Sequence, residues 1–208
     1  MSPDVVVVSS GNTPFIPDIP GKDGDNVLPA TAVFDGKNKI GEKVVIVGGG
    51  GIGIEIAPHL AQRSNLRPDI VSFLSENNAL EDEDKWLLER GEDEITMTTR
   101  QNTIGGSIGS FTRWVLAREV DNSGINVMYG TTAENITDKG VVVAQNGKSE
   151  LISADTILLA GGLVHDQKVY KSIKDSKIPG EIYALGESGS LNHAIDAVRE
   201  AYELALRI

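Results

Sequence analysis

The stretch KVVIVGGGGIGIEIA, residues 43–57, decides the fold class of this chain. Its apolar run Val44–Val47 is typical of a buried parallel strand, and the apolar residues after the glycine cluster predict the start of a helix. Gly48, Gly50 and Gly53 have the G-x-G-x-x-G spacing of a dinucleotide-binding turn. A strand, a glycine turn and a helix in this order predict an α/β protein with a Rossmann-like domain.

The glycine turn is also the first candidate binding site. We expect Gly48, Gly50 and Gly53 to cradle a pyrophosphate at the positive end of the following helix, with Gly51 adding a backbone N–H. Glu55 lies just beyond, either near the reactive end of the bound cofactor or, as we favour, as a capping or surface acid. A dinucleotide cofactor carries its own chemistry and the protein binds and orients it, so no catalytic residue is predicted.

Composition narrows the classes of partner. The chain has 208 residues, 40% of them hydrophobic and 24% charged, with a formal net charge of −11 and no cysteine. The negative charge argues against nucleic acid and anionic membranes, and the lack of cysteine excludes disulfides and thiolate-bound metals or iron–sulfur clusters within it. The histidines lack metal-ligand spacing, so no metal site is predicted. With no signal peptide or membrane-length apolar run, we expect a cytoplasmic protein.

The second strand of the Rossmann-like unit has two candidates. DIVSFLSE, residues 69–76, has the spacing expected for a strand that ends in a ribose-binding acid, here Glu76. EITMTTR, residues 94–100, lies farther along but is richer in β-branched residues. We prefer the second candidate, which makes residues 65–93 an insertion with an amphipathic, acidic helix near its end.

The remaining elements complete an α/β arrangement. We expect a helix over 111–120, strands and hairpins from 125 to 159, and a strand, a glycine turn and a long amphipathic helix over 180–208. DVVVVSSG, residues 4–11, and DTILLAGG, residues 155–162, are similar buried strands that flank the glycine unit. Between the first of them and residue 43, prolines and glycines predict an irregular crossover.

Four motifs together resemble the C-terminal region of the NADH:flavin oxidoreductase family, which includes 2,4-dienoyl-CoA reductase, 2-enoate reductase and trimethylamine dehydrogenase. The motifs are SSGNTPFIPDIPG (9–21), KVVIVGGGGIGIE (43–55), IGGSIGSFTRW with Arg113 and Trp114 (104–114), and GEIYALGESGSLNHAIDAVREAYELAL (180–206). The resemblance covers nearly the whole chain. It implies a disulfide-reductase type NAD(P)-binding domain inserted between two pieces of an FAD-binding domain.

The resemblance also implies domain boundaries and flavin contacts. Residues 1–41 and 155–208 would be the pieces of the FAD-binding domain, and 42–154 the NAD(P)-binding domain. The further cofactor-binding positions that it implies are Gly11, Gly161, Gly162, Gly186, Glu187 and Ser188. Glu187 stands where the family has an aspartate that binds the flavin, and its side chain is one methylene longer.

Coenzyme choice depends on which strand is the second one. If residues 94–100 form it, Thr99 takes the place of the usual acid and Arg100 can pair with a 2′-phosphate, which favours NADPH over NADH. If Glu76 ends the strand instead, NADH is favoured.

The resemblance implies the function of an NAD(P)H-docking module that delivers hydride to FAD in a flavin-dependent enoyl or dienoyl-CoA reductase. In such enzymes electrons continue to an iron–sulfur cluster and FMN in an old yellow enzyme-type barrel. The barrel and the first glycine motif of the FAD domain are not in this sequence, so we expect a part of a larger enzyme with little turnover alone. A structural site for ADP, as in trimethylamine dehydrogenase-like proteins, and a scaffold with a vestigial nucleotide loop are the alternatives.

Overall fold

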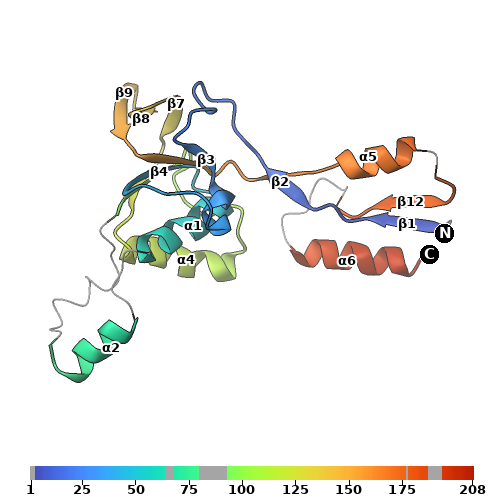
Figure 1. The fold of residues 1–208 in the computed structure, drawn as a ribbon, viewed down its shortest axis with the longest axis horizontal. Helices are drawn as coiled ribbons and strands as arrows, with labels where there is room; N and C mark the ends of the chain where they lie inside the picture. The colour runs from blue at the N-terminus through green and yellow to red at the C-terminus, as the bar shows by residue number, and fades with distance from the viewer. Residues whose placement is uncertain (1–2, 64–67, 80–92, 177, 187–193) are drawn as a thin grey trace. The chain divides into compact units, whose positions relative to one another are not determined.

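The computed structural model describes residues 3–63, 68–79, 93–176, 178–186 and 194–208. The chain forms two compact units: Phe15–Gly162, the larger unit, and Met1–Pro14 with Leu163–Ile208, the smaller unit. The division explains why the ends of the chain belong together, since both contribute to the smaller unit (Figure 1).

The larger unit is built on a five-stranded parallel sheet with the strand order β3-β10-β4-β5-β6. Its strands are β3 (Val27–Pro29), β4 (Lys43–Val47), β5 (Glu94–Thr98), β6 (Asn126–Met128) and β10 (Thr156–Leu159). The helices are η1 (Ala30–Asp35), α1 (Gly51–Gln62), α2 (Pro68–Glu76) and α4 (Ser110–Asn122). A parallel sheet with the predicted strand–glycine turn–helix unit at its centre confirms the Rossmann-like α/β fold.

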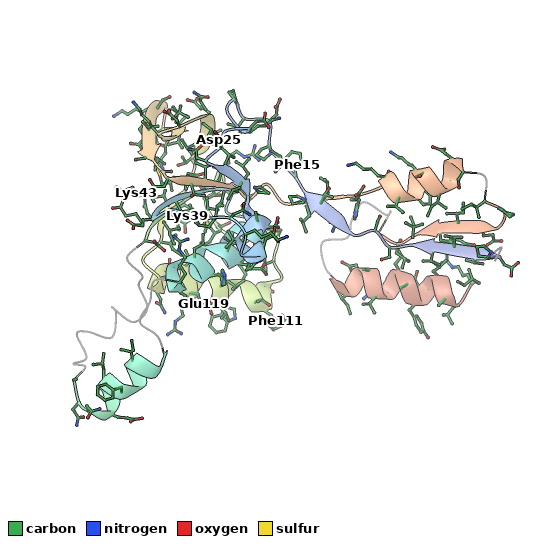
Figure 2. All side chains as sticks on the ribbon, in the orientation of Figure 1. Phe15, Asp25, Lys39, Lys43, Phe111 and Glu119 are labelled. Carbon is green, nitrogen blue, oxygen red and sulfur yellow. The ribbon has the colours of Figure 1, made fainter. Side chains whose placement is uncertain are left out.

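Helices cover one face of this sheet, and a small antiparallel sheet covers the other. Val44 and Ile46 of β4 pack with the buried residues of α1 and α4, whereas Val45 and Val47 pack with a three-stranded antiparallel meander. The meander consists of β7 (Thr132–Thr137), β8 (Gly140–Gln145) and β9 (Lys148–Ser153). Successive side chains of a strand point to opposite faces, so a central strand covered on both faces is apolar throughout. Phe111 on α4 is exposed on the outer side (Figure 2).

The preferred second strand is confirmed. β5 pairs in parallel with β4 from Lys43↔Glu94 to Val47↔Thr98. Residues 68–76 form the helix α2, so the alternative strand that ended in Glu76 is wrong. The amphipathic helix expected near the end of the insertion falls mostly on residues 80–92, outside the described residues.

The position of β10 differs from the expectation. We expected residues 155–208 to return to an FAD-binding domain, but β10 pairs with β4 on one side and β3 on the other. All its side chains are buried, so the strand needs cover on both faces of its sheet as well as partners for its backbone. The larger unit provides both, so β3 and β10 belong to the same sheet as the glycine turn.

The smaller unit contains two short sheets and two helices. β1 (Val5–Val8) pairs in parallel with β12 (Glu181–Ala184), and β2 (Asn12–Pro14) pairs antiparallel with β11 (Leu163–His165). Figure 1 shows α5 (Lys168–Asp175) and α6 (Ala194–Ala205) on either side of the β1–β12 pair. One face of α6 leaves three large side chains exposed, Ile195, Val198 and Tyr202, and Leu206 just after the helix is exposed as well.

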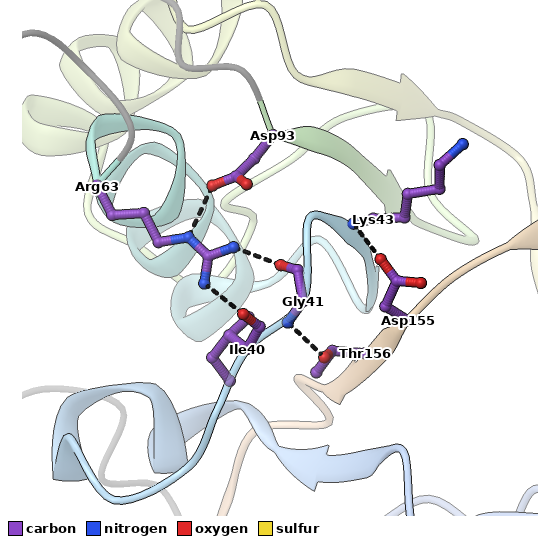
Figure 3. A network of polar contacts seen from close by, with 7 residues as sticks. All are labelled: Ile40, Gly41, Lys43, Arg63, Asp93, Asp155 and Thr156. Carbon is purple, nitrogen blue, oxygen red and sulfur yellow. Dashed lines mark hydrogen bonds and ion pairs between the residues drawn. The ribbon is translucent and has the colours of Figure 1, made fainter.

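A polar network fixes the amino-terminal ends of the central strands (Figure 3). Arg63, at the end of α1, donates to the Asp93 carboxylate at 2.7 Å, to the carbonyl oxygen of Ile40 at 3.3 Å and to that of Gly41. On the other side, the Gly41 N–H donates to the Thr156 hydroxyl at 3.0 Å. The network ties α1 and the start of β10 to the residues just before β4.

We expect Arg63→Ala to lower the free energy of unfolding by about 1–3 kcal/mol, because a guanidinium that donates to a carboxylate and two carbonyls is lost. Urea unfolding followed by circular dichroism measures this change. Lys43→Ala is the matched control: its exposed ion pair with Glu94 is worth at most about 0.5 kcal/mol, and its backbone N–H still donates to Asp155. Equal effects of the two changes would contradict a structural role for Arg63.

Candidate functional site

A cleft of about 700 Å³ opens at the carboxyl ends of β4, β5 and β10, within the larger unit. The strand ends and turns contribute Val47, Gly48, Gly49, Gly50, Thr98, Thr99, Arg100, Gln101, Ala160 and Gly161. The rims contribute Phe15, Pro17, Asp18, Ile19, Gly106, Ser107, Thr131, Thr132 and Ala133. The lining is thus mostly backbone, hydroxyl groups and small apolar side chains.

The cleft lies where the strand order reverses. From β4 the chain proceeds to β5 and β6 on one side, and then returns through the meander to β10 on the other side of β4. In open α/β sheets, ligands bind outside the carboxyl ends of the strands at such a switch point. The cleft at the glycine turn therefore has the position that this rule favours for a ligand.

The glycines of the turn have different physical roles. Gly48 has φ +122°, and a Cβ there would lie 2.5 Å from the carbonyl oxygen of Ala160. A Cβ on Gly53 would lie 2.0 Å from the carbonyl oxygen of Gly48, so this position lets α1 pack closely on β4. Gly50 is open, because its nearest neighbour would be the Ser107 Oγ at 3.8 Å. The turn thus leaves space for a pyrophosphate against the Gly50 backbone.

A second glycine loop, residues 104–109, packs on the first. The Gly105 N–H donates to the carbonyl oxygen of Gly49 at 2.7 Å, and the Gly51 N–H donates to the Ser107 Oγ at 2.9 Å. The N–H that we expected Gly51 to offer to a ligand is therefore bonded to a hydroxyl that itself lines the cleft. Ser107 was not among the predicted binding residues, although a serine between glycines in a second glycine-rich loop is a signal that the sequence contains.

Thr99 and Arg100 follow β5 at the far side of the cleft. Thr99 is buried, its hydroxyl accepts the Gln101 N–H at 3.2 Å, and its backbone bonds to Met128 and Thr131. Arg100 is exposed and lines the cleft. Thr99 is thus a fixed, uncharged residue of the cleft lining, and the positive charge beside it comes from Arg100.

The other predicted positions do not all gather in the cleft. Gly161 lines it, and a Cβ there would lie 2.6 Å from the carbonyl oxygen of Phe15. Gly162, with φ +102°, is the last residue of the larger unit. Gly11 and Gly186 belong to the smaller unit, where they line a separate cavity of about 20 Å³. Glu187 and Ser188 lie outside the described residues.

The smaller cavity does not by itself hold a flavin. Its lining includes Gly11, Gly186, His165, Asp166 and Tyr170, but 20 Å³ is about the space of one water molecule. Glu55, the other acid that we considered, is exposed on α1 and is not among the residues that line the large cleft. In the parts of the chain that the structure describes, no group of three or more His, Asp or Glu could hold a metal ion, and no helix is long and apolar enough to cross a membrane.

Comparison with known proteins identifies the family. The family model described as pyridine nucleotide-disulphide oxidoreductase matches residues 1–201. The chain belongs to this family. Membership implies binding of FAD and NAD(P), and the open glycine turn fits the pyrophosphate of such a cofactor.

Individual relatives are larger proteins. The chain is 31% identical to a metal reductase of Desulforamulus reducens over 203 residues, 97% of this chain and 30% of the relative. It is 26% identical to a cinnamate reductase of Clostridium sporogenes over 208 residues, 99% of this chain and 26% of the relative. A solved 2-naphthoyl-CoA reductase complex matches with a TM-score of 0.78 and 25% identity, over 100% of this chain and 27% of that one. The chain thus spans less than a third of the length of these relatives.

Proposed function

We propose that this chain docks NAD(P)H, with NADPH preferred, and presents it for hydride transfer to FAD in a larger flavin-dependent reductase of enoyl or dienoyl compounds. The observation that carries the proposal is the cleft: an open glycine turn at the switch point of a parallel sheet, continuous with Arg100 at the end of the second strand. A dinucleotide needs these features in this order, because its pyrophosphate lies between two nucleoside halves.

We assign a role to each part of the cleft. The Gly48–Gly50 turn and the Ser107 hydroxyl receive the pyrophosphate. The adenosine half lies toward Thr99 and Arg100, where the guanidinium can form a charge-assisted hydrogen bond with a 2′-phosphate. The nicotinamide half then lies on the β10 side, against Phe15 and Gly161. When bound, the coenzyme supplies the hydride, and the residues of this chain bind and orient it.

The substrate class rests on the relatives. The names of two of them specify cinnamate and 2-naphthoyl-CoA, which are both conjugated carboxylic acid derivatives. Together with the four motifs that resemble the dienoyl-CoA and enoate reductase branch, this supports an enoyl or dienoyl acid or thioester as the substrate of the complete enzyme. That substrate would bind in an FMN-containing barrel served by an iron–sulfur cluster.

The smaller unit has the features of an incomplete domain that needs further residues to cover it. A two-stranded parallel sheet is too small to be stable by itself, and α6 exposes a continuous apolar face. We propose that the smaller unit belongs to an FAD-binding domain, with Gly11 and Gly186 near the flavin, and that further residues of that domain cover the α6 face.

Calorimetric titration of the chain with NADPH, NADH and ADP tests the docking function. We expect NADPH to bind most tightly and ADP most weakly, since only the dinucleotides can also contact the β10 side of the cleft. ADP binding as tight as that of either dinucleotide would instead indicate a structural adenine-nucleotide site without hydride transfer. No binding of any of the three would indicate that the glycine turn is vestigial.

A further inference from the structure

Two ionisable residues, Arg100 and Asp18, stand among the described residues that line the cleft. Arg100 follows β5, and Asp18 lies in the segment 15–19, whose first residue, Phe15, contacts Gly161 just after β10. If the adenosine half occupies the Arg100 end, the nicotinamide half lies near Asp18. This step rests on the proposed function.

The segment that carries Asp18 is held at both ends. The Phe15 N–H donates to the carbonyl oxygen of Gly162 at 2.9 Å, and the carbonyl oxygen of Pro20 accepts the Ile136 N–H at 2.8 Å. Between them Ile19 packs against the buried cluster under the meander. Gly21 allows the close approach, because a Cβ there would lie 2.0 Å from the carbonyl oxygen of Ile136. The backbone that carries Asp18 therefore has a defined place at the cleft.

Asp18 has a cationic partner four residues along the chain. The Lys22 ammonium group donates to the Asp18 carboxylate at 2.7 Å. This hydrogen bond holds the pKa of Asp18 below its usual range and raises the pKa of Lys22. The Asp18 side chain is 98% exposed and that of Lys22 30%, so the carboxylate is the more accessible member of the pair. Both groups are charged at neutral pH.

The two redox states of the coenzyme differ at the nicotinamide ring. The oxidised ring carries a positive charge and the reduced ring is neutral, while the rest of the molecule is the same. An unpaired carboxylate near the ring attracts the oxidised form, and a neighbouring ammonium group opposes that attraction. After NADPH has given its hydride, with two electrons, to the flavin, NADP⁺ must leave before the next turnover.

We propose that the Asp18–Lys22 pair sets the relative affinity of the cleft for oxidised and reduced coenzyme, and that Lys22 limits retention of the oxidised product.

The test compares the ratio of the dissociation constants for NADP⁺ and NADPH among variants that remove one or both charges of the pair. Dissociation constants for NADP⁺ and NADPH are determined by calorimetry at low ionic strength for the wild type, Lys22→Gln, Asp18→Asn and the double variant. The ratio cancels effects on the phosphates, which both coenzymes share. Because the charges are exposed, we expect a shift of roughly two- to fivefold toward NADP⁺ in Lys22→Gln. Asp18→Asn should shift the ratio the other way, and the double variant should return it near the wild-type value.

Controls separate this effect from general charge. Asp25→Asn removes a nearby exposed acid that does not line the cleft (labelled in Figure 2), and should leave the ratio unchanged. The shifts should also shrink at about 0.5 M salt, where screening shortens the range of exposed charges. Equal ratios in all variants would overturn the inference while leaving the docking function intact. A wild type that binds neither coenzyme would overturn the docking function, and this inference with it.

Discussion

Gly53→Ala is expected to destabilise the larger unit and to lower NADPH affinity by roughly tenfold or more, about 1.4 kcal/mol or greater. Alanine favours a helix over glycine by about 1 kcal/mol, so propensity alone predicts stabilisation. The new Cβ, however, would lie 2.0 Å from the carbonyl oxygen of Gly48. This oxygen belongs to the backbone, so it can move away only if the whole glycine turn shifts. Helix α1 must therefore separate from β4, at a cost of about 1–3 kcal/mol, and the phosphate site is displaced with it.

The matched control for this prediction is Gly50→Ala in the same turn. Gly50 has φ −76°, and its Cβ would meet only the Ser107 Oγ, at 3.8 Å. We expect the stability to change by less than about 0.5 kcal/mol, since the position is open and unstrained. NADPH affinity should still fall, because the methyl group occupies the place where the backbone approaches the pyrophosphate. Urea unfolding and calorimetric titration of both variants separate the two roles; wild-type stability of Gly53→Ala would contradict the packing argument.

Arg100→Ala is expected to remove the preference for NADPH. A hydrogen bond to a charged group contributes about 1.5–3 kcal/mol, which corresponds to roughly 10- to 100-fold in affinity. The loss should fall on NADPH, because only this coenzyme carries the 2′-phosphate, and NADH binding should change by less than about twofold at constant salt. Parallel titrations with the two coenzymes measure the difference directly.

Arg118→Ala on α4 is the control for the arginine change. It removes the same charge from an exposed position that does not line the cleft, so both coenzymes should bind as to the wild type. An equal loss for NADPH and NADH in Arg100→Ala would show that Arg100 contacts a group common to both. No change for either would show that the adenosine half does not occupy the β5 side of the cleft.

Local pattern was sufficient for the central unit of the fold. Residues 43–57 predicted β4, the turn and α1, because an apolar strand, closely spaced glycines and an apolar helix each follow from short-range chemistry. The choice of residues 94–98 over 69–76 as the second strand was also correct, because β-branched residues favour a pleated, buried surface. The family resemblance extended this to a flavin- and nicotinamide-binding protein.

Other features depended on contacts between distant residues. The sequence near residues 156–159 could not decide whether this strand pairs with β1 or with β4, because buried parallel strands have similar compositions. In the structure it pairs with the edge of β4 that β5 does not occupy, and the meander covers one of its faces. The same holds for the hydrogen bond between Ser107 and Gly51 and for the approach of Asp18 to the cleft, which join residues far apart in the chain. The sequence by itself predicted which turn would receive a phosphate, whereas the tertiary structure decided which side chains surround that turn, because those neighbours are set by packing across the sheet.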